Sequence, residues 1–179
     1  MGFARATTEL LEAGRRESMA NSFESLAQRE REGLVSFARG MLADGHEAED
    51  AAQEALLRLY QCWERADDPR AFLYKTISNL CIDRLRQLAR IPPPPPSLAW
   101  EAAGRAEIGE RAAAVRAALD ELPPDERAAV LLREVERLSY GEIATALEAT
   151  VPQVTNWIHR GKNRLRRLLA RYVEEGSQP

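Results

Sequence analysis

The sequence predicts an all-α protein of two small helical domains joined by a proline-rich, extended linker. Apolar residues recur at helical spacing on both sides of a central break. Within that break, residues 92–96 are five consecutive prolines, which cannot form a helix and favour polyproline II. The chain has 179 residues, of which 30% are charged and 6% are aromatic, a composition suited to helices and to two small domains. We expect a disordered extension at 1–19, a first domain at 20–90, the linker at 91–107, a second domain at 108–173 and a tail at 174–179.

The first domain is predicted to contain three helices. The first follows a capping Ser22 and ends at Asp44-Gly45. The second runs from about residue 47 to 63, and its acidic start complements the helix dipole. After a loop at 65–69, the third runs from 70 to about 89. The residues of the second helix that we expect to face inward are Ala51, Ala55, Leu56, Leu59, Tyr60 and Trp63.

Two polar rows remain on the outer sides of these helices. The row on the second helix is Asp50, Gln53, Glu54 and Leu57. The exposed side of the third helix offers Lys75, Ser78, Asn79, Arg84 and Arg86. By themselves, both rows are most simply interpreted as solvated faces.

The second domain is predicted to end in a helix-turn-helix at 138–172. One helix precedes it around Val115, a loop follows at 122–124, and a further helix spans 127–137. Ser139 and Glu142 form a capping box for the first helix of the motif. The turn is 148–150, after which Thr150 can cap the second helix and Pro152 occupies its first turn.

The second helix of this motif separates an apolar stripe from a basic face. The stripe that we expect to be buried is Val154, Ile158, Gly161, Leu165 and Leu168. The opposite face carries amides first and arginines behind them, and no acidic residue lies between Glu148 and Glu174. Such a helix fits recognition of DNA, because amides can contact base edges while arginines neutralise phosphates. The alternative is a solvated basic face on an ordinary helix pair.

Charge is distributed unevenly although the formal net charge is only -3. Residues 101–150 carry 6 basic and 11 acidic side chains, whereas residues 151–179 carry 6 and 2; residues 1–50 carry 6 and 10, and residues 51–100 carry 7 and 5. The repeated order, acidic and then basic, suggests two modules that each combine a protein-facing part with a nucleic-acid-facing part.

Other functional classes have no support in the sequence. No apolar run is long enough to span a bilayer and no segment resembles a signal peptide, so we expect a cytoplasmic protein without membrane insertion. Cys62 and Cys81 match no metal-ligand spacing and are expected to be buried thiols. No catalytic constellation is apparent, and we expect no enzyme activity, no metal and no cofactor.

Two segments together resemble the extracytoplasmic-function (group 4) sigma factors of RNA polymerase. The segments 48–60 (AEDAAQEALLRLY) and 71–86 (AFLYKTISNLCIDRLR) are similar to region 2 of that family. The helix-turn-helix, with 122–127 (LPPDER) ahead of it, is similar to region 4. The resemblance covers roughly residues 20–90 and 108–172, in the family's order.

This resemblance implies a role for each row of residues. Docking on the clamp helices of the largest subunit of core RNA polymerase would involve Asp50, Gln53, Glu54 and Leu57. Contacts to the melted -10 promoter element would involve Arg65, Arg70, Lys75, Ser78, Asn79, Asp83, Arg84 and Arg86. Contacts to the -35 element would involve Arg133, Arg137, Gln153, Thr155, Asn156, His159, Arg160, Lys162 and Arg164.

Further partners also follow from the resemblance. The second domain would grip the flap of the second-largest polymerase subunit, and an anti-sigma factor would hold the free protein. Melted DNA also needs an aromatic platform, for which Trp63, Phe72 and Tyr74 are candidates, with core packing favoured for the first two.

The chain departs from the family in its recognition helix. Where the family often has Thr-Val-Lys-Ser-Arg, residues 153–157 are Gln-Val-Thr-Asn-Trp, so the base preference should differ, and Trp157 should pack against the neighbouring helix. Two other functions remain open. A one-component regulator with the same motif would bind DNA as a tight dimer without polymerase, and a helical adaptor, or anti-sigma-like interaction protein, would not bind DNA at all.

Overall fold

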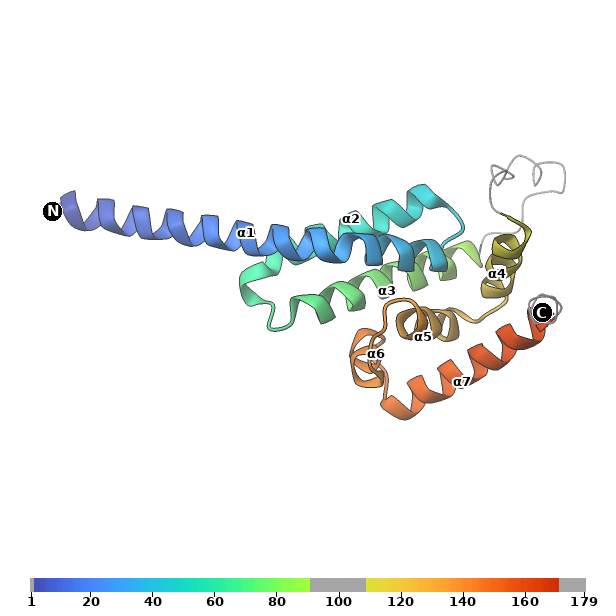
Figure 1. Cartoon of the computed structure of the whole chain (residues 1–179). Coiled ribbons are helices and arrows are strands. Elements are labelled where there is room, and N and C mark those ends of the chain that lie inside the picture. Colours follow the sequence, from blue (N-terminus) through green and yellow to red (C-terminus); the bar gives the residue numbers. More distant parts are fainter. Residues whose placement is uncertain (1, 91–108, 171–179) are drawn as a thin grey trace, which may run out of the picture.

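The computed structural model describes residues 2–90 and 109–170, with side chains from Ser22 onward, and this part of the chain is helical without strands. The elements in order are α1 (Gly2–Met41), α2 (Gly45–Cys62), the short 3-10 helix η1 (Trp63–Arg65), α3 (Pro69–Leu88), α4 (Glu110–Asp120), α5 (Pro124–Glu134), α6 (Tyr140–Ala146) and α7 (Val151–Leu168) (Figure 1). The all-α prediction is confirmed. The predicted polyproline segment and the tail at 174–179 lie outside the described residues.

Local capping sets the starts of α2 and α3. Asp44 accepts hydrogen bonds from the backbone amides of His46 and Glu47, at 2.7 and 3.1 Å. Asp68 accepts from the Ala71 amide at 3.0 Å, and Pro69 follows it as the first residue of α3. Both carboxylates bind otherwise unpaired amides in the first turn of a helix. The pair Asp44-Gly45, which we predicted as a helix end, therefore also opens the next helix.

Helix α1 is longer than the sequence led us to expect. It begins at Gly2, so the segment that we predicted to be a disordered extension, 1–19, is helical from its second residue. The composition explains the difference, because this segment lacks proline and is rich in alanine, leucine, glutamate and arginine, which favour helix. In Figure 1 this half of α1 projects beyond α2 and α3.

Each half of the chain contributes to the buried core. In the first half α1, α2 and α3 pack together around Phe37, Leu59 and Ile77, all fully buried. In the second half α5, α6 and α7 pack around Leu132, Ile143 and Val154.

Two expected core positions are wrong. Tyr60 is 60% exposed and Leu168 is 43% exposed. Leu59 already occupies the core position on α2, and its neighbour Tyr60 lies about 100° further around the helix. Tyr60 instead places its ring edge-on to Phe23, with the ring centres 5.1 Å apart. Leu168 is the last residue of α7, where the helix extends past the core.

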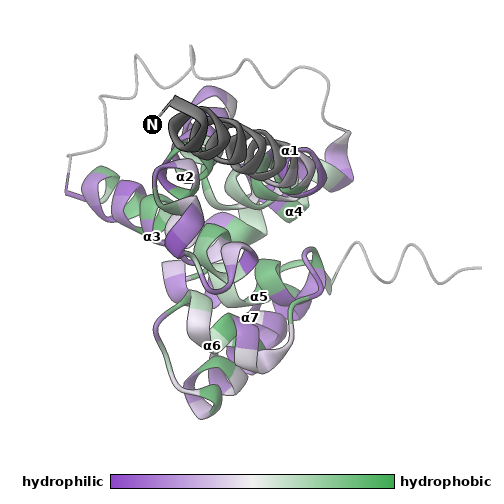
Figure 2. Ribbon diagram, turned by 90° about the vertical axis from the view of Figure 1, so that its left-hand side faces the viewer, coloured by the Kyte–Doolittle hydropathy of each residue, from purple (hydrophilic) through white to green (hydrophobic). Residues whose placement is uncertain are grey.

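The two halves are not separate bodies in this structure. Helix α1 packs on α4 and α5, while α3 packs on α5 and α6. One buried cluster runs through both halves, from Leu34 and Phe37 on α1 to Leu131 on α5 and Ile143 on α6. Figure 2 looks down α1 and shows α5, α6 and α7 gathered against one side of the first three helices. The chain is therefore closed, and one face of α3 lies inside.

Candidate functional site

The helix-turn-helix is built by two capping boxes. The Ser139 hydroxyl accepts from the Glu142 amide at 3.3 Å, and the Glu142 carboxylate accepts from the Ser139 amide at 2.7 Å. Thr150 and Gln153 form the same reciprocal pair at the start of α7. These contacts confirm the predicted motif. They also fix the direction in which α7 leaves the domain.

Helix α7 lies close to α5 because of one glycine. A Cβ at Gly161 would lie 2.7 Å from Val130 Cγ2, nearer than side chains tolerate. Val154 and Ile158 are buried on the same side of α7, and Trp157 packs against the core at its edge, as predicted. With this side buried, the opposite face of α7 is turned to solvent.

The outward face of α7 carries most of the predicted -35 residues. Gln153, Thr155, Asn156, His159 and Arg160 are all exposed. Asn156 and Arg160 lie one turn apart, and no hydrogen bond or ion pair joins the side chain of either to another described residue. Two further cations are already tied to the domain. Lys162 pairs with Glu134 at 3.0 Å, and Arg164 donates to the Glu121 carbonyl at 3.3 Å.

A small basic hollow adjoins this face. Its volume is about 300 Å³, and its lining is Tyr140, Thr155, Ile158, His159, Lys162, Asn163 and Arg166. Arg133 donates to the Leu138 carbonyl at 2.9 Å and lies over the Tyr140 ring, 5.0 Å from its centre. Arg137 is exposed in a left-handed backbone conformation, with φ of 59°. Sequence reasoning missed Tyr140, whose place in the hollow depends on how α6 meets α7.

The row predicted on α2 is exposed throughout. Asp50, Gln53 and Glu54 are open to solvent, and Leu57 is 57% exposed. Glu54 pairs with Arg58 one turn later, at 2.6 Å. The exposed Tyr60 extends the apolar part of the row, a contribution that we missed by assigning it to the core. An acidic and apolar face of this kind is suited to binding another protein.

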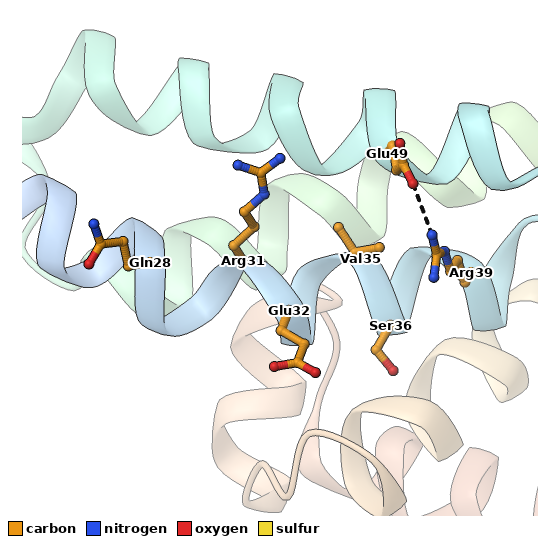
Figure 3. Close-up of a pocket in the computed structure, with 7 residues that line it drawn as sticks. All are labelled: Gln28, Arg31, Glu32, Val35, Ser36, Arg39 and Glu49. Atoms are coloured by element: carbon orange, nitrogen blue, oxygen red, sulfur yellow. Dashed lines mark hydrogen bonds and ion pairs between the residues drawn. The ribbon is translucent and has the colours of Figure 1, made fainter.

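An open hollow of about 610 Å³ lies beside this row, between α1 and α2 (Figure 3). Its lining is Gln28, Arg31, Glu32, Val35, Ser36, Arg39 and Glu49. The ion pair between Arg39 and Glu49, at 2.9 Å, closes one end of it. Glu49 of α2 lines the hollow and is the neighbour of Asp50 in the sequence, and the other lining residues belong to α1. The hollow therefore lies next to the exposed row on α2.

The predicted -10 residues divide into a group apart from the second half of the chain and a group in contact with it. Arg65, Asp83 and Arg86 are exposed, and Arg84 is half-buried, 3.8 Å from Glu47. In the second group the side chains of Arg70 and Lys75 are paired with the second half but stay 38% and 44% exposed. Arg70 contacts Glu142 at 3.5 Å, and Lys75 pairs with Glu148 at 2.7 Å. Asn79, one turn after Lys75, is half-buried.

Two expectations about this face are wrong for the closed chain. Ser78, predicted to be exposed, has no exposed surface, and its hydroxyl has no hydrogen-bond partner. Tyr74, our preferred aromatic platform, is 1% exposed, so it cannot stack on a base here. The reason is the same for both residues. Helix α3 lies between the first helices and α5–α6, so this side of it is buried by residues distant in the sequence.

Three carboxylates surround the covered end of α3. The Tyr74 hydroxyl donates to Glu136 at 2.8 Å and lies 3.4 Å from Glu30. Arg70 donates to Glu30 at 3.2 Å and contacts Glu142. Burial raises the pKa of the Glu136 carboxyl, although its contacts with Tyr74 and Arg70 act in the opposite direction. The Glu136 carboxyl is thus harder to ionise in this cluster than in water.

We therefore expect Glu136→Gln to raise the melting temperature at pH 7 to 8, by about 2 °C or more. The amide keeps an acceptor for Tyr74 and removes a half-buried charge that lies near Glu30. Since the folded-state pKa of Glu136 is raised from 4.5, its stabilising contribution is full below pH 4.5 and is lost as pH rises through the raised pKa. The gain in melting temperature of the Glu136→Gln protein should therefore disappear near pH 4. Thermal melts across this pH range measure it.

The control for this experiment is Glu24→Gln, a change at an exposed carboxylate in the interior of α1. It should leave the melting temperature almost unchanged at every pH. A Glu136→Gln protein that melts lower than the parent at pH 8 would contradict a destabilising charge at this position.

The described residues contain no group of side chains able to hold a metal ion and no helix suited to crossing a membrane. Cys81 is buried, and burial raises the pKa of its thiol to about 12, so it stays protonated at neutral pH. Cys62 is half-buried, and its thiol donates to the Arg58 carbonyl at 3.3 Å. Both cysteines are free thiols, and the predicted burial is confirmed for Cys81 but not for Cys62.

Comparison with known proteins points to one family. Residues 26–91 match the family model for Sigma-70 region 2, and residues 112–165 match that for Sigma-70, region 4. The chain is 30% identical to the ECF RNA polymerase sigma factor SigE of Mycolicibacterium smegmatis, over 96% of this chain and 70% of that one. It is 32% identical to the RNA polymerase sigma-E factor of Streptomyces coelicolor, over 85% and 89% of the two chains.

Two solved structures share the fold. The first is the sigma factor RpoE in complex with the anti-sigma factor NepR from Bartonella quintana, with a TM-score of 0.64 and 20% identity over 83% of this chain and 97% of that one. The second is CnrH in complex with the cytosolic domain of CnrY, with a TM-score of 0.64 and 24% identity over 84% and 89%.

Proposed function

Because this chain belongs to the extracytoplasmic-function sigma factors, which direct RNA polymerase to specific promoters, we propose that three of its surfaces divide this work. The outward face of α7 reads duplex DNA at the -35 element. The row on α2 binds the core polymerase. The cationic side of α3 binds the melted strand at the -10 element.

One observation carries the whole proposal, and it concerns two side chains on the outward face of α7. Asn156 and Arg160 stand exposed one turn apart on α7, unpaired within the described residues. Asparagine suits adenine and arginine suits guanine in the major groove. The Gln153 carbonyl is held by Thr150, which leaves its NH₂ group free to donate. Arg133, Arg137, Lys162 and Arg164 flank this pair and supply phosphate contacts.

Core polymerase binding is assigned to Asp50, Gln53, Glu54 and Leu57, with Tyr60 beside them. The carboxylates present negative charge around an exposed leucine, which is the pattern of an interface with a polar rim and an apolar centre. We place the clamp helices of the largest subunit on this row, and the flap of the second-largest subunit on the second domain.

The melted strand is assigned to α3 and the residues before it. Arg65, Asp83, Arg84 and Arg86 are accessible as the chain stands. Arg70 and Lys75 are partly exposed but paired with Glu142 and Glu148, Asn79 is half-buried and Ser78 is buried, so the four become fully available only when the second half moves away from α3. Binding of the -10 strand therefore requires separation of the two halves.

The chain provides promoter specificity to RNA polymerase. We propose no catalytic activity and no cofactor for the chain itself. It works where the polymerase and the chromosome are, in the cytoplasm. One of the two solved structures of the same fold pairs a sigma factor with an anti-sigma factor. We propose a partner of that class for this chain too.

Transcription with purified core RNA polymerase and a library of genomic promoters tests the whole proposal. Adding the protein should produce new transcripts whose start sites share two upstream motifs. The opposite result is tight, sequence-specific binding by the protein alone with no polymerase-dependent transcript. That result would favour a one-component regulator.

A further inference from the structure

Gln153 has two tasks at the start of α7, and we propose that the first restricts the second. Its carbonyl caps the helix, which leaves its NH₂ group for the base edges of the -35 element. A glutamine in this state only donates hydrogen bonds to DNA, so it selects bases that present acceptors. This inference rests on the assignment of α7 in the proposed function, and it adds which bases the residue selects.

The carbonyl oxygen of Gln153 is fully occupied by Thr150. It accepts from the Thr150 backbone amide at 2.8 Å and from the Thr150 hydroxyl, also at 2.8 Å. A side-chain carbonyl has two lone pairs, and these two donors use both of them. The side-chain amide cannot turn over, because its NH₂ group would then meet the Thr150 N–H, which can only donate. The helix cap therefore fixes the orientation of this amide.

The cap is reciprocal, which makes it costly to release. The Gln153 backbone amide donates to the Thr150 hydroxyl at 3.4 Å while the Gln153 side chain returns to Thr150. Turning the carbonyl toward a base would break both of its hydrogen bonds, and the base would replace them with one. The NH₂ group has no such tie, because no hydrogen bond joins it to another described residue.

The bases differ in the donors and acceptors that they present in the major groove. Guanine offers two acceptors, N7 and O6, and thymine offers one, O4. Cytosine offers only its N4 amino group, a donor that would meet the NH₂ group of Gln153. Adenine normally binds glutamine through N6 and N7 together, and the N6 half of this contact needs the carbonyl that is occupied here. Gln153 should therefore favour guanine, then thymine, and disfavour cytosine most strongly.

The neighbouring contact residues differ from Gln153 in this respect. Neither the carbonyl nor the NH₂ group of Asn156, one turn later, is bonded within the described residues, so Asn156 can bind adenine through both. The Thr155 hydroxyl donates to the Val151 carbonyl at 2.9 Å, so its oxygen is left to accept from a base. Hydrogen bonds within α7 thus give Gln153 and Thr155 opposite polarity toward DNA.

The decisive variant is Gln153→Glu in the full-length protein. A carboxylate oxygen can accept both hydrogen bonds from Thr150, and glutamate at this position completes a capping box, as Glu142 does on α6. The outward group changes from a donor to an acceptor, so the favoured base should become cytosine or adenine, whose amino groups donate. The melting temperature should not fall, because the first turn of a helix favours negative charge.

The probe is a pool of duplex promoters with random bases over the -35 element, each identified by a barcode in its transcript and transcribed by the protein with purified core RNA polymerase. At one upstream position the parent should favour guanine or thymine over cytosine by about tenfold, the discrimination of one good base contact. Gln153→Glu should reverse the preference at that position alone. The control is Gln61→Glu, the same substitution at an exposed site on α2, and it should change no position.

Thr150 supplies an independent test that leaves Gln153 unchanged. Thr150→Ser keeps the hydroxyl and should keep the parental base preference. Thr150→Val removes the hydroxyl and frees one lone pair of the Gln153 carbonyl, so adenine should rise relative to guanine at the same position. Valine also weakens the cap and should lower the melting temperature. A loss of stability alone would lower transcription from every template equally and would leave the base preference unchanged.

An upstream motif that stays the same in the Gln153→Glu protein would overturn the inference. A parental preference for adenine or cytosine at the position that changes would do so too, as would parental base frequencies in the Thr150→Val protein. Loss of transcription from every template by a Gln153→Glu protein with the parental melting temperature would also contradict it. Failure of the proposed function is distinguishable, because the parent itself would then give no polymerase-dependent transcripts with an upstream motif.

Discussion

Replacing Arg160 by glutamate is expected to reduce promoter-directed transcription about 100-fold. Arg160 is exposed on the outward face of α7 and pairs with no other described residue. A good bidentate contact to a base contributes about 1–3 kcal/mol, and the reversed charge adds repulsion from phosphates. At about 1.4 kcal/mol per factor of ten, such losses amount to about two powers of ten. Run-off transcription with core polymerase on a cognate promoter is the measurement.

The matched control is Arg111→Glu, an exposed arginine on α4 in the same half of the chain. It changes the net charge equally and should alter transcription less than about threefold, in keeping with a small non-specific term. Neither change should shift the melting temperature appreciably, because both side chains are on the surface. Equal losses from the two substitutions would show that α7 does not read the promoter.

Leu57→Asp is expected to weaken binding to core RNA polymerase by about 30-fold or more. Leu57 is 57% exposed in the middle of an acidic row, so an interface on this row would bury it as an apolar anchor. Anchors of that kind contribute about 2 kcal/mol or more, which corresponds to about 30-fold in affinity. A carboxylate there would also remain unpaired among Asp50 and Glu54. Equilibrium binding of labelled protein to purified core enzyme measures the change.

Leu88→Asp serves as the control, because Leu88 is a comparably exposed leucine, at 50%, at the end of α3. It should bind the core enzyme as the parent does. Should Leu57→Asp retain parental affinity, the polymerase surface would have to be sought elsewhere, with the hollow between α1 and α2 as the next candidate.

Features that depend on neighbouring residues could be predicted from the sequence. The capping boxes at Ser139 and Thr150 join residues three positions apart, so the local pattern contains all the information needed. The same holds for the buried side of α7, where Val154 and Ile158 follow helical spacing. The outward face of α7 then follows directly, and with it the best-supported part of the candidate site.

Features that depend on the meeting of distant segments could not be predicted. Helical spacing places Ser78 and Lys75 on the outer side of α3, and within the first three helices that expectation is reasonable. Their burial and pairing come from α5, α6 and the turn after α6, such as Glu148, which lies more than 70 residues further along the chain. The spacing of apolar residues within one helix does not show that α5 and α6 pack against α3. Gly33 and Gly40, small residues inside α1, are the places where the described part of α1 makes room for the second half of the chain.

These two glycines have a genetic consequence. Every single-base change that replaces a glycine by another amino acid adds a side chain, and at residues 33 and 40 that side chain would collide with the second half of the chain. Missense mutations at these codons would therefore loosen the packing between the two halves of the chain without changing the surfaces that we assign to polymerase and duplex DNA. A library of alleles at codon 40 should lose thermal stability in proportion to the size of the new side chain, whereas alleles at codon 141, where a Cβ meets nothing within 4 Å, should not.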